Sequence, residues 1–278
     1  FDQPALYGVA SGYAHLAGEH ARSIVLAEQG IALAPHRTHP DTRWCHWGAG
    51  VAHTHAGNLE RVAPAEDDQE ASALEAGDLH SHAIFAAGRA IWAAAACPLD
   101  APRYGERGLA LANAVGSPAV RASAHLYAGA AESAAGDLRA AKAHYQRAFE
   151  LATLSGNRCI EALTVAWMTA RTPAGEREAA CRTAIEHLVE MLDWMSMWVC
   201  LESLAAHWAV ADPPMAGLIL GHLQEHRIGH AGVAKRRARA LESLAAAGAD
   251  GSLAAGRLLS RSELLARVRD RLASGSAG

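Results

Sequence analysis

The sequence predicts an all-α fold: a right-handed solenoid of about six helical hairpins, closed by a C-terminal helical cap. Glycine turns recur at a nearly constant step, since Gly18, Gly57, Gly136 and Gly175 are 39, 79 and 39 residues apart. The chain between the turns is rich in Ala and Leu, and no segment alternates apolar and polar residues over a strand's length. A fixed period of this size is typical of stacked helical hairpins, which bury their faces against one another.

Each hairpin is expected to hold a first helix, A, and a second helix, B. The expected hairpins occupy residues 4–35, 43–76, 79–115, 118–155, 158–192 and 194–227, within a repeat domain at 1–230. Proline marks several boundaries, because it fits the first turn of a helix but not its interior. Pro40 falls in the first linker, while Thr172–Pro173 and Asp212–Pro213 each read as an N-cap followed by proline.

Residues 231–278 are expected to form capping helices and a tail. Two further helices are predicted near 235–247 and 261–272. Ser260 and Glu263 have the spacing of a capping box and predict the start of the last helix.

The composition narrows the class of protein. The chain has 278 residues, 51% of them hydrophobic but only 5% aromatic, so small side chains must fill much of the interior. The net charge of -4 points to no polyanionic partner, and no apolar stretch of about 18 residues predicts a membrane span. The five cysteines are odd in number and lack CxxC spacing, which fits a reducing cytoplasm and no structural zinc. Because the chain begins with Phe, we expect a fragment of something larger.

Residues 122–155 resemble a tetratricopeptide repeat (TPR). Gly129 and Ala141 are small where helices A and B of that repeat cross, and Tyr145 is the large side chain beside the crossing. The other positions that align with the family pattern are His125, Ala128, Glu132, Ala148 and Thr153. The Trp, Tyr and Pro of that pattern are absent here, so the match is partial. The period of 39 residues exceeds the usual ~34, so the repeats are called TPR-like.

The C-terminal part resembles a more specific group of proteins. Residues 194–226 and 256–263 are similar to the end of the repeat region in large bacterial LuxR-type and cyclase-like signal-transduction ATPases. The resemblance implies an attached ATPase or DNA-binding module in the parent chain. Neither a GxxxxGK(S/T) loop nor a recognition-helix module occurs here, so phosphate binding and direct nucleic-acid reading are expected to lie outside this fragment.

The TPR resemblance also implies a binding surface, because A helices line the concave groove in that family. Residues at groove positions or sharing a face with them are Trp44, Trp47, His55, Phe85, Arg89 and Trp92. Aromatic side chains and an arginine that can clamp a carboxylate suit a peptide, protein or small effector. The alternative is that these residues form the core between repeats.

The functional expectation is a non-catalytic sensor or scaffold region of a larger bacterial transcriptional regulator, without a cofactor or metal. A freestanding TPR adaptor is one alternative. The other is a metal-dependent hydrolase, because His222, Glu225 and His226 have the H-x-x-E-H spacing of inverted zincins. We expect this motif to be inert, with His222 and His226 on a solvent-facing side of their helix and no third ligand.

Overall fold

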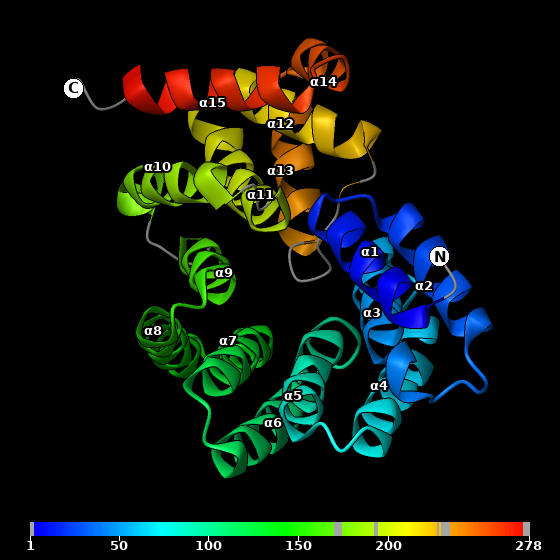
Figure 1. Ribbon diagram of the computed structural model, residues 1–278. Helices are drawn as coiled ribbons and strands as arrows, with labels where there is room; N and C mark the ends of the chain where they lie inside the picture. Colours follow the sequence, from blue (N-terminus) through cyan, green and yellow to red (C-terminus); the bar gives the residue numbers. More distant parts are fainter. Residues whose placement is uncertain (1–2, 170–173, 192–193, 227, 229–233, 275–278) are drawn as a thin grey trace. The chain divides into compact units, whose positions relative to one another are not determined.

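The computed structural model describes residues 3–169, 174–191, 194–226, 228 and 234–274, and all of its regular structure is helical (Figure 1). The chain divides into two compact units, unit 1 (Phe1–Thr164) and unit 2 (Val165–Gly278). No helix in the described ranges is long and apolar enough to cross a membrane.

Unit 1 is a succession of antiparallel helices joined by short turns. They are α1 (Pro4–Leu16), α2 (His20–Leu33), α3 (Arg43–Ala56), α4 (Val62–Glu75), α5 (Leu79–Ala96), α6 (Ala101–Val115), α7 (Pro118–Ala135), α8 (Leu138–Ser155) and the start of α9 (Arg158–Thr169). Short 3-10 turns, η1 (Pro40–Thr42) and η2 (Leu59–Arg61), precede α3 and α4. Each helix from α1 to α7 packs on the next, and α1 on α3 and α5 on α7 as well.

Small residues set the helix spacing in unit 1. Gly129 of α7 faces Tyr145 of α8, and a Cβ atom added at Gly129 would lie 2.8 Å from the tyrosine ring. The sequence therefore placed this crossing correctly. Gly105 of α6 is equally close to Ala128 of α7. Such approaches need glycine or alanine because a larger side chain would push the helices apart.

The turns of unit 1 follow the predicted glycines. Gly18, Gly57 and Gly136, which end α1, α3 and α7, all have positive φ, between 77° and 100°. Glycine adopts this left-handed conformation without a steric penalty, so it ends helices readily. Asp137 then caps α8 by accepting a hydrogen bond of 2.8 Å from the backbone N–H of Ala140.

In its described residues, unit 2 contains the end of α9 and six further helices. They are α10 (Ala174–Met191), α11 (Trp194–Ala211), α12 (Pro213–Glu225), α13 (Ala234–Ala246), α14 (Asp250–Arg257) and α15 (Arg261–Ser274). The predicted capping box is present, because the backbone N–H of Ser260 donates to Glu263 at 2.8 Å. The last three helices pack on α10, α11 and α12, with α14 especially close to α12 at Gly217, Gly221 and Gly256.

Helix positions agree closely with the sequence prediction except at α14, which falls between the two C-terminal helices expected near 235–247 and 261–272, where no helix was predicted. The all-α class is observed, while the solenoid arrangement and the number of hairpins stay predictions. The division at residues 164 and 165 falls inside α9, and the expected boundary at 230 and 231 lies outside the described residues. Thr172 and Pro173 also lie outside them. Asp212 does cap α12, accepting from the N–H of Met215 at 3.3 Å.

Candidate partner-binding surface

The two tryptophans of α3 lie half-buried against glycines of α1. A Cβ atom at Gly8 would approach Trp44, and one at Gly12 would lie 3.3 Å from the ring of Trp47. The two indole rings meet edge to face, with centroids 5.9 Å apart. Each ring is thus held by a neighbouring helix while part of it faces solvent, which is how an aromatic anchor is kept rigid.

Phe85 extends this aromatic contact to α5 but is itself part of the core. Its ring meets Trp44 edge to face at 5.3 Å, and only 1% of the residue is exposed. Phe85 therefore supports Trp44 and offers a partner almost no surface of its own. Trp92, two turns further along α5, is half-buried and packs edge to face on Tyr104 of α6 at 6.3 Å.

His55 belongs to a cluster of three imidazoles on α1, α2 and α3. The ring centroids of His15, His20 and His55 lie 5.1 to 5.4 Å from one another, and His15 also meets Trp47 at 5.9 Å. Burial, together with a smaller contribution from His55, lowers the pKa of His20 to about 4, so the ring stays neutral near pH 7. The sequence analysis placed His55 in the groove but missed this cluster, which joins residues 35 and 40 positions apart.

Arg89 binds carboxylates of its own chain. Its guanidinium donates to Glu70 at 2.9 Å and to Asp67 at 2.6 Å, both on α4. Arg107 of α6 donates to both oxygens of Glu70, at 3.0 and 2.5 Å. Burial acts to raise the pKa of Glu70, but the bonds from the two arginines outweigh it and hold that pKa below its ordinary value. The arginine expected to clamp a partner is thus already engaged between α4 and α5.

A second carboxyl of α4, one turn earlier, has no such compensation. Glu66 is 6% exposed, and its Oε2 has no hydrogen-bond partner among the described residues. Burial raises the pKa of Glu66 to about 8, although the nearby Arg89 charge opposes the rise. The neighbouring Gln69 is 1% exposed, and both of its amide atoms lack partners in the described part of the chain. Glu66 and Gln69 therefore form a buried polar layer near Arg89, and three of their polar atoms lack hydrogen-bond partners among the described residues.

The sequence contains a signal for this polar layer. Glu66 and Glu70 are four residues apart and thus share one face of α4. That face points inward because α4 packs on both α3 and α5, and Glu66 and Glu70 are buried there. Both carboxyls are therefore buried, and Arg89 is a counterion of Glu70.

The inverted zincin motif of unit 2 corrects one expectation. His222 does not face solvent: it is 0% exposed, and its Nδ1 bonds to the carbonyl oxygen of Leu259 at 2.9 Å. The reason is that α14 packs so closely on α12 that this side of the helix is covered. His226 is exposed, as expected, and so is Glu225. In the parts of the chain that the structure describes, no group of three or more His, Cys, Asp or Glu residues is placed to hold a metal ion.

A cluster of Trp and Met residues on α11 in unit 2 is part of the core. Met197, Trp198 and Trp208 are at most 3% exposed. Trp198 stacks at 5.4 Å on both Trp194 and His222, and Arg261 lies over the two tryptophan rings. The buried His222 is therefore part of an aromatic core.

Comparisons with known proteins assign this chain to no family. No protein-family model matches the chain, and no curated protein is similar to it. The resemblance to TPR and LuxR-type regions rests on the residues quoted above and on the all-helical fold.

Proposed function

We propose that this chain is a non-catalytic, TPR-like sensor or scaffold region of a larger bacterial transcriptional regulator. Its partner is a protein, peptide or small effector, and it binds along the A helices α3 and α5. The proposal includes a right-handed solenoid of about six hairpins, a cytoplasmic location, and ATPase or DNA-binding modules elsewhere in the parent chain.

One observation carries the proposal: half-buried tryptophan rings sit on neighbouring A helices and are each held by a second helix. Trp44 and Trp47 pack on α1 and on each other, and Trp92 packs on α6. A rigid indole loses little conformational entropy on binding, which is why Trp is enriched among residues that dominate binding energy. The chain has only seven tryptophans, and three of them, Trp44, Trp47 and Trp92, lie on the proposed surface.

The charge network gives the surface a way to respond to a partner. Arg89 and Arg107 share Glu70, so a ligand carboxylate that bound Arg89 would exchange with Asp67, which is 67% exposed. Such an exchange would keep the buried Glu70 paired through Arg107. An effector that binds one arrangement of α4 and α5 more tightly than another shifts their populations, and an attached module could sense that shift.

Selection and titration test the proposal. A library of helical and extended peptides displayed on phage is selected against the purified chain, and enriched peptides are titrated by fluorescence anisotropy. We expect Trp47→Ala to weaken binding by tenfold or more, since a truncated aromatic anchor typically costs ~2 kcal/mol. Exposed Leu154→Ala on α8 is the control and should bind as the unmodified chain does. Enrichment of no peptide, or equal binding by Trp47→Ala with its helicity intact, would refute the proposal.

Metal analysis separates this proposal from the hydrolase alternative. His222 already bonds to Leu259 and lies in an aromatic core, so it is poorly placed as a ligand of an open catalytic metal. Purified protein should carry far less than one zinc per chain. One tightly bound zinc, lost in His226→Ala, would favour the hydrolase instead.

A further inference from the structure

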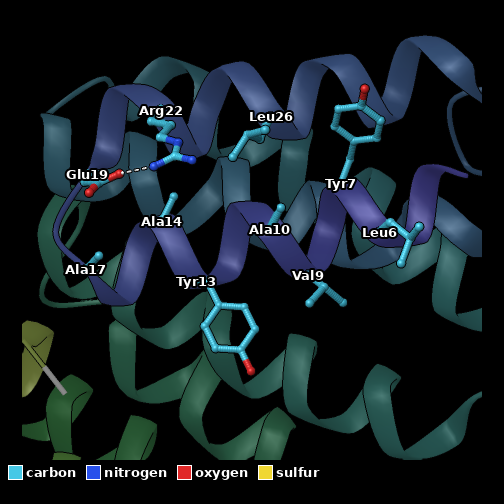
Figure 2. A pocket seen from close by; sticks show the side chains of 10 residues that line it. All are labelled: Leu6, Tyr7, Val9, Ala10, Tyr13, Ala14, Ala17, Glu19, Arg22 and Leu26. Atoms are coloured by element: carbon cyan, nitrogen blue, oxygen red, sulfur yellow. Dashed lines mark hydrogen bonds and ion pairs between the residues drawn. The ribbon is translucent and has the colours of Figure 1, made fainter. Parts of the chain in front are cut away.

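Two grooves on the described surface differ in how their charged residues are arranged. The larger groove, of about 600 Å³, lies between α1 and α2 in unit 1. Figure 2 shows its two charged residues, Glu19 and Arg22, bonded to each other at 2.9 Å beside a largely apolar lining. The residues that line this groove therefore offer a ligand no unpaired charge.

The second groove, of about 340 Å³, lies in unit 2 between α10 and α15. Its volume falls within the range of about 300–1,000 Å³ that is usual for small-molecule sites. Its floor is apolar, because Ile185 of α10 and Leu272 of α15 line it and are at most 1% exposed. Ala266 and Ala273 of α15 also line it, and their short side chains leave the hollow open.

Four charged side chains line the two walls of this groove. Arg182 and Glu186 come from α10, and Arg269 and Asp270 come from α15. Residues three or four apart share one face of a helix. Arg182 and Glu186 thus lie on one face of α10, while Arg269 and Asp270 follow Ala266 by three and four residues on α15. Each wall therefore presents one base and one acid.

These charges are not engaged with one another. Glu186, Arg269 and Asp270 are exposed, and none of the three makes a hydrogen bond or an ion pair with the described residues. Arg182 is half-buried, and its Nη2 donates to the carbonyl oxygen of Leu272 at 2.5 Å. Its Nε and Nη1 make no hydrogen bond in the described part of the chain, and Nη1 is not buried. Arg182 is therefore held in place by α15 while it keeps a donor for a ligand.

We propose that the α10–α15 groove binds a zwitterionic α-amino acid with an aliphatic side chain. The carboxylate of the ligand accepts hydrogen bonds from Arg182 and Arg269. Its ammonium group binds the carboxylates of Glu186 and Asp270. Its side chain rests on the apolar floor, where apolar surface is removed from water.

The balance of charge in the groove favours a zwitterion over a simple ion. Two arginines and two carboxylates give the lining no net charge. A ligand with a single charge would gain opposite charges on each wall but would also meet like charges there. An amino acid carries both signs on adjacent groups, so it can pair with all four side chains.

Isothermal titration calorimetry of the full chain tests the proposal with L-leucine, L-isoleucine and L-valine as probes. At least one of them should bind at one site per chain with a dissociation constant of about 1 mM or below. Two analogues of leucine separate the two charges. Leucinamide lacks the carboxylate and 4-methylpentanoate lacks the ammonium group, and each should bind at least tenfold more weakly than leucine.

Variants of the groove place the site. Asp270→Asn should weaken binding by tenfold or more, because it removes one partner of the ammonium group. Ala266→Leu fills the hollow and should abolish binding. Both positions are exposed, so both variants should fold, which circular dichroism confirms. Arg182→Gln should also weaken binding. Arg267→Gln, at an exposed position of α15 that does not line the groove, is the matched control and should bind normally.

Three results would overturn the proposal. The first is no binding of any of the three amino acids at concentrations up to about 10 mM. The second is binding of leucinamide or 4-methylpentanoate as tight as that of leucine, which would mean that only one charge is recognised. The third is unchanged binding in folded Asp270→Asn and Ala266→Leu. Neither α3 nor α5 lines this groove, so the result does not depend on the proposed function.

Discussion

The two units build their cores from side chains of different size. In unit 1 the fully buried members of the clusters between α5, α6 and α7 are all alanine except Val120, and larger side chains such as Tyr127 pack against them only partly buried. In unit 2, Trp208, Met197 and several leucines and isoleucines fill the interior. Of the twelve largest fully buried side chains in the described residues, nine lie in unit 2, although it is the shorter unit.

The difference shows which property of each unit is sensitive to mutation. Where alanine and glycine set the helix spacing, there is no room for an added atom, and enlargement is costly. Where large side chains fill the space, removal leaves a cavity and truncation is costly. Two predictions test this contrast, the larger expected effect first, and two more test the buried polar groups of unit 1.

The largest effect is expected for Trp208→Ala in unit 2. Trp208 is 0% exposed, its Nε1 donates to Glu178 at 2.5 Å, and Arg271 lies 5.3 Å from its ring centroid. Truncation of a buried tryptophan typically costs about 3–5 kcal/mol of unfolding free energy. Urea unfolding measures the loss, and Trp208→Phe should retain a large part of the stability. Equal stability of Trp208→Ala and the unmodified chain would show that this core is not tightly packed.

In unit 1 the corresponding test is enlargement at Gly129. A leucine there would collide with the Tyr145 ring, and overpacking of this kind typically costs about 1–3 kcal/mol or more. The matched control is Gly88→Ala on α5, where an added Cβ meets nothing within 4 Å. That control should be neutral or stabilise by up to about 1 kcal/mol, because alanine favours helix. Equal melting temperatures for Gly129→Leu and Gly88→Ala would contradict the helix register.

Arg89→Met tests the charge network in which Arg89 and Arg107 both bind Glu70. Glu70 would lose one of its two arginines but keep Arg107, so we expect a loss of about 1–3 kcal/mol, typical of a hydrogen bond to a charged group. Arg103→Met, which breaks only an exposed contact with Asp100, should change stability by less than about 0.5 kcal/mol. If both variants lose the same amount, the buried position of Glu70 has no special importance.

The last prediction concerns the pH dependence of stability and Glu66. Its pKa is raised from 4.5 to about 8 in the folded chain, so the native state holds a proton that the unfolded chain releases above pH 4.5. The contribution of Glu66 to stability is therefore present below 4.5 and is lost as the pH rises through about 8. Glu66→Gln removes the titration, and its stability relative to the unmodified chain should rise across this window. Parallel stability curves from about pH 5 to about pH 9 would mean that Glu66 is not buried as described.

The sequence predicted local features well and contacts between distant helices poorly. The turn at Gly136, the crossing of Gly129 with Tyr145 and the cap at Asp212 each depend on a few neighbouring residues with strong backbone preferences. The network of Arg89 and Arg107 with Glu70, and the burial of His222, depend on how helices pack over sequence separations of 19 to 37 residues. Helical periodicity shows that a residue lies on a face, but it does not reveal whether α14 or solvent covers that face.

Hydrogen exchange with a selected peptide bound tests the central claim most directly, namely that α3 and α5 form the binding surface. The claim predicts slower amide exchange in the segments holding Trp44, Trp47 and Trp92 when peptide is added, and no such change with Trp47→Ala. Protection confined to α10–α15, with α3 and α5 unchanged, would contradict it.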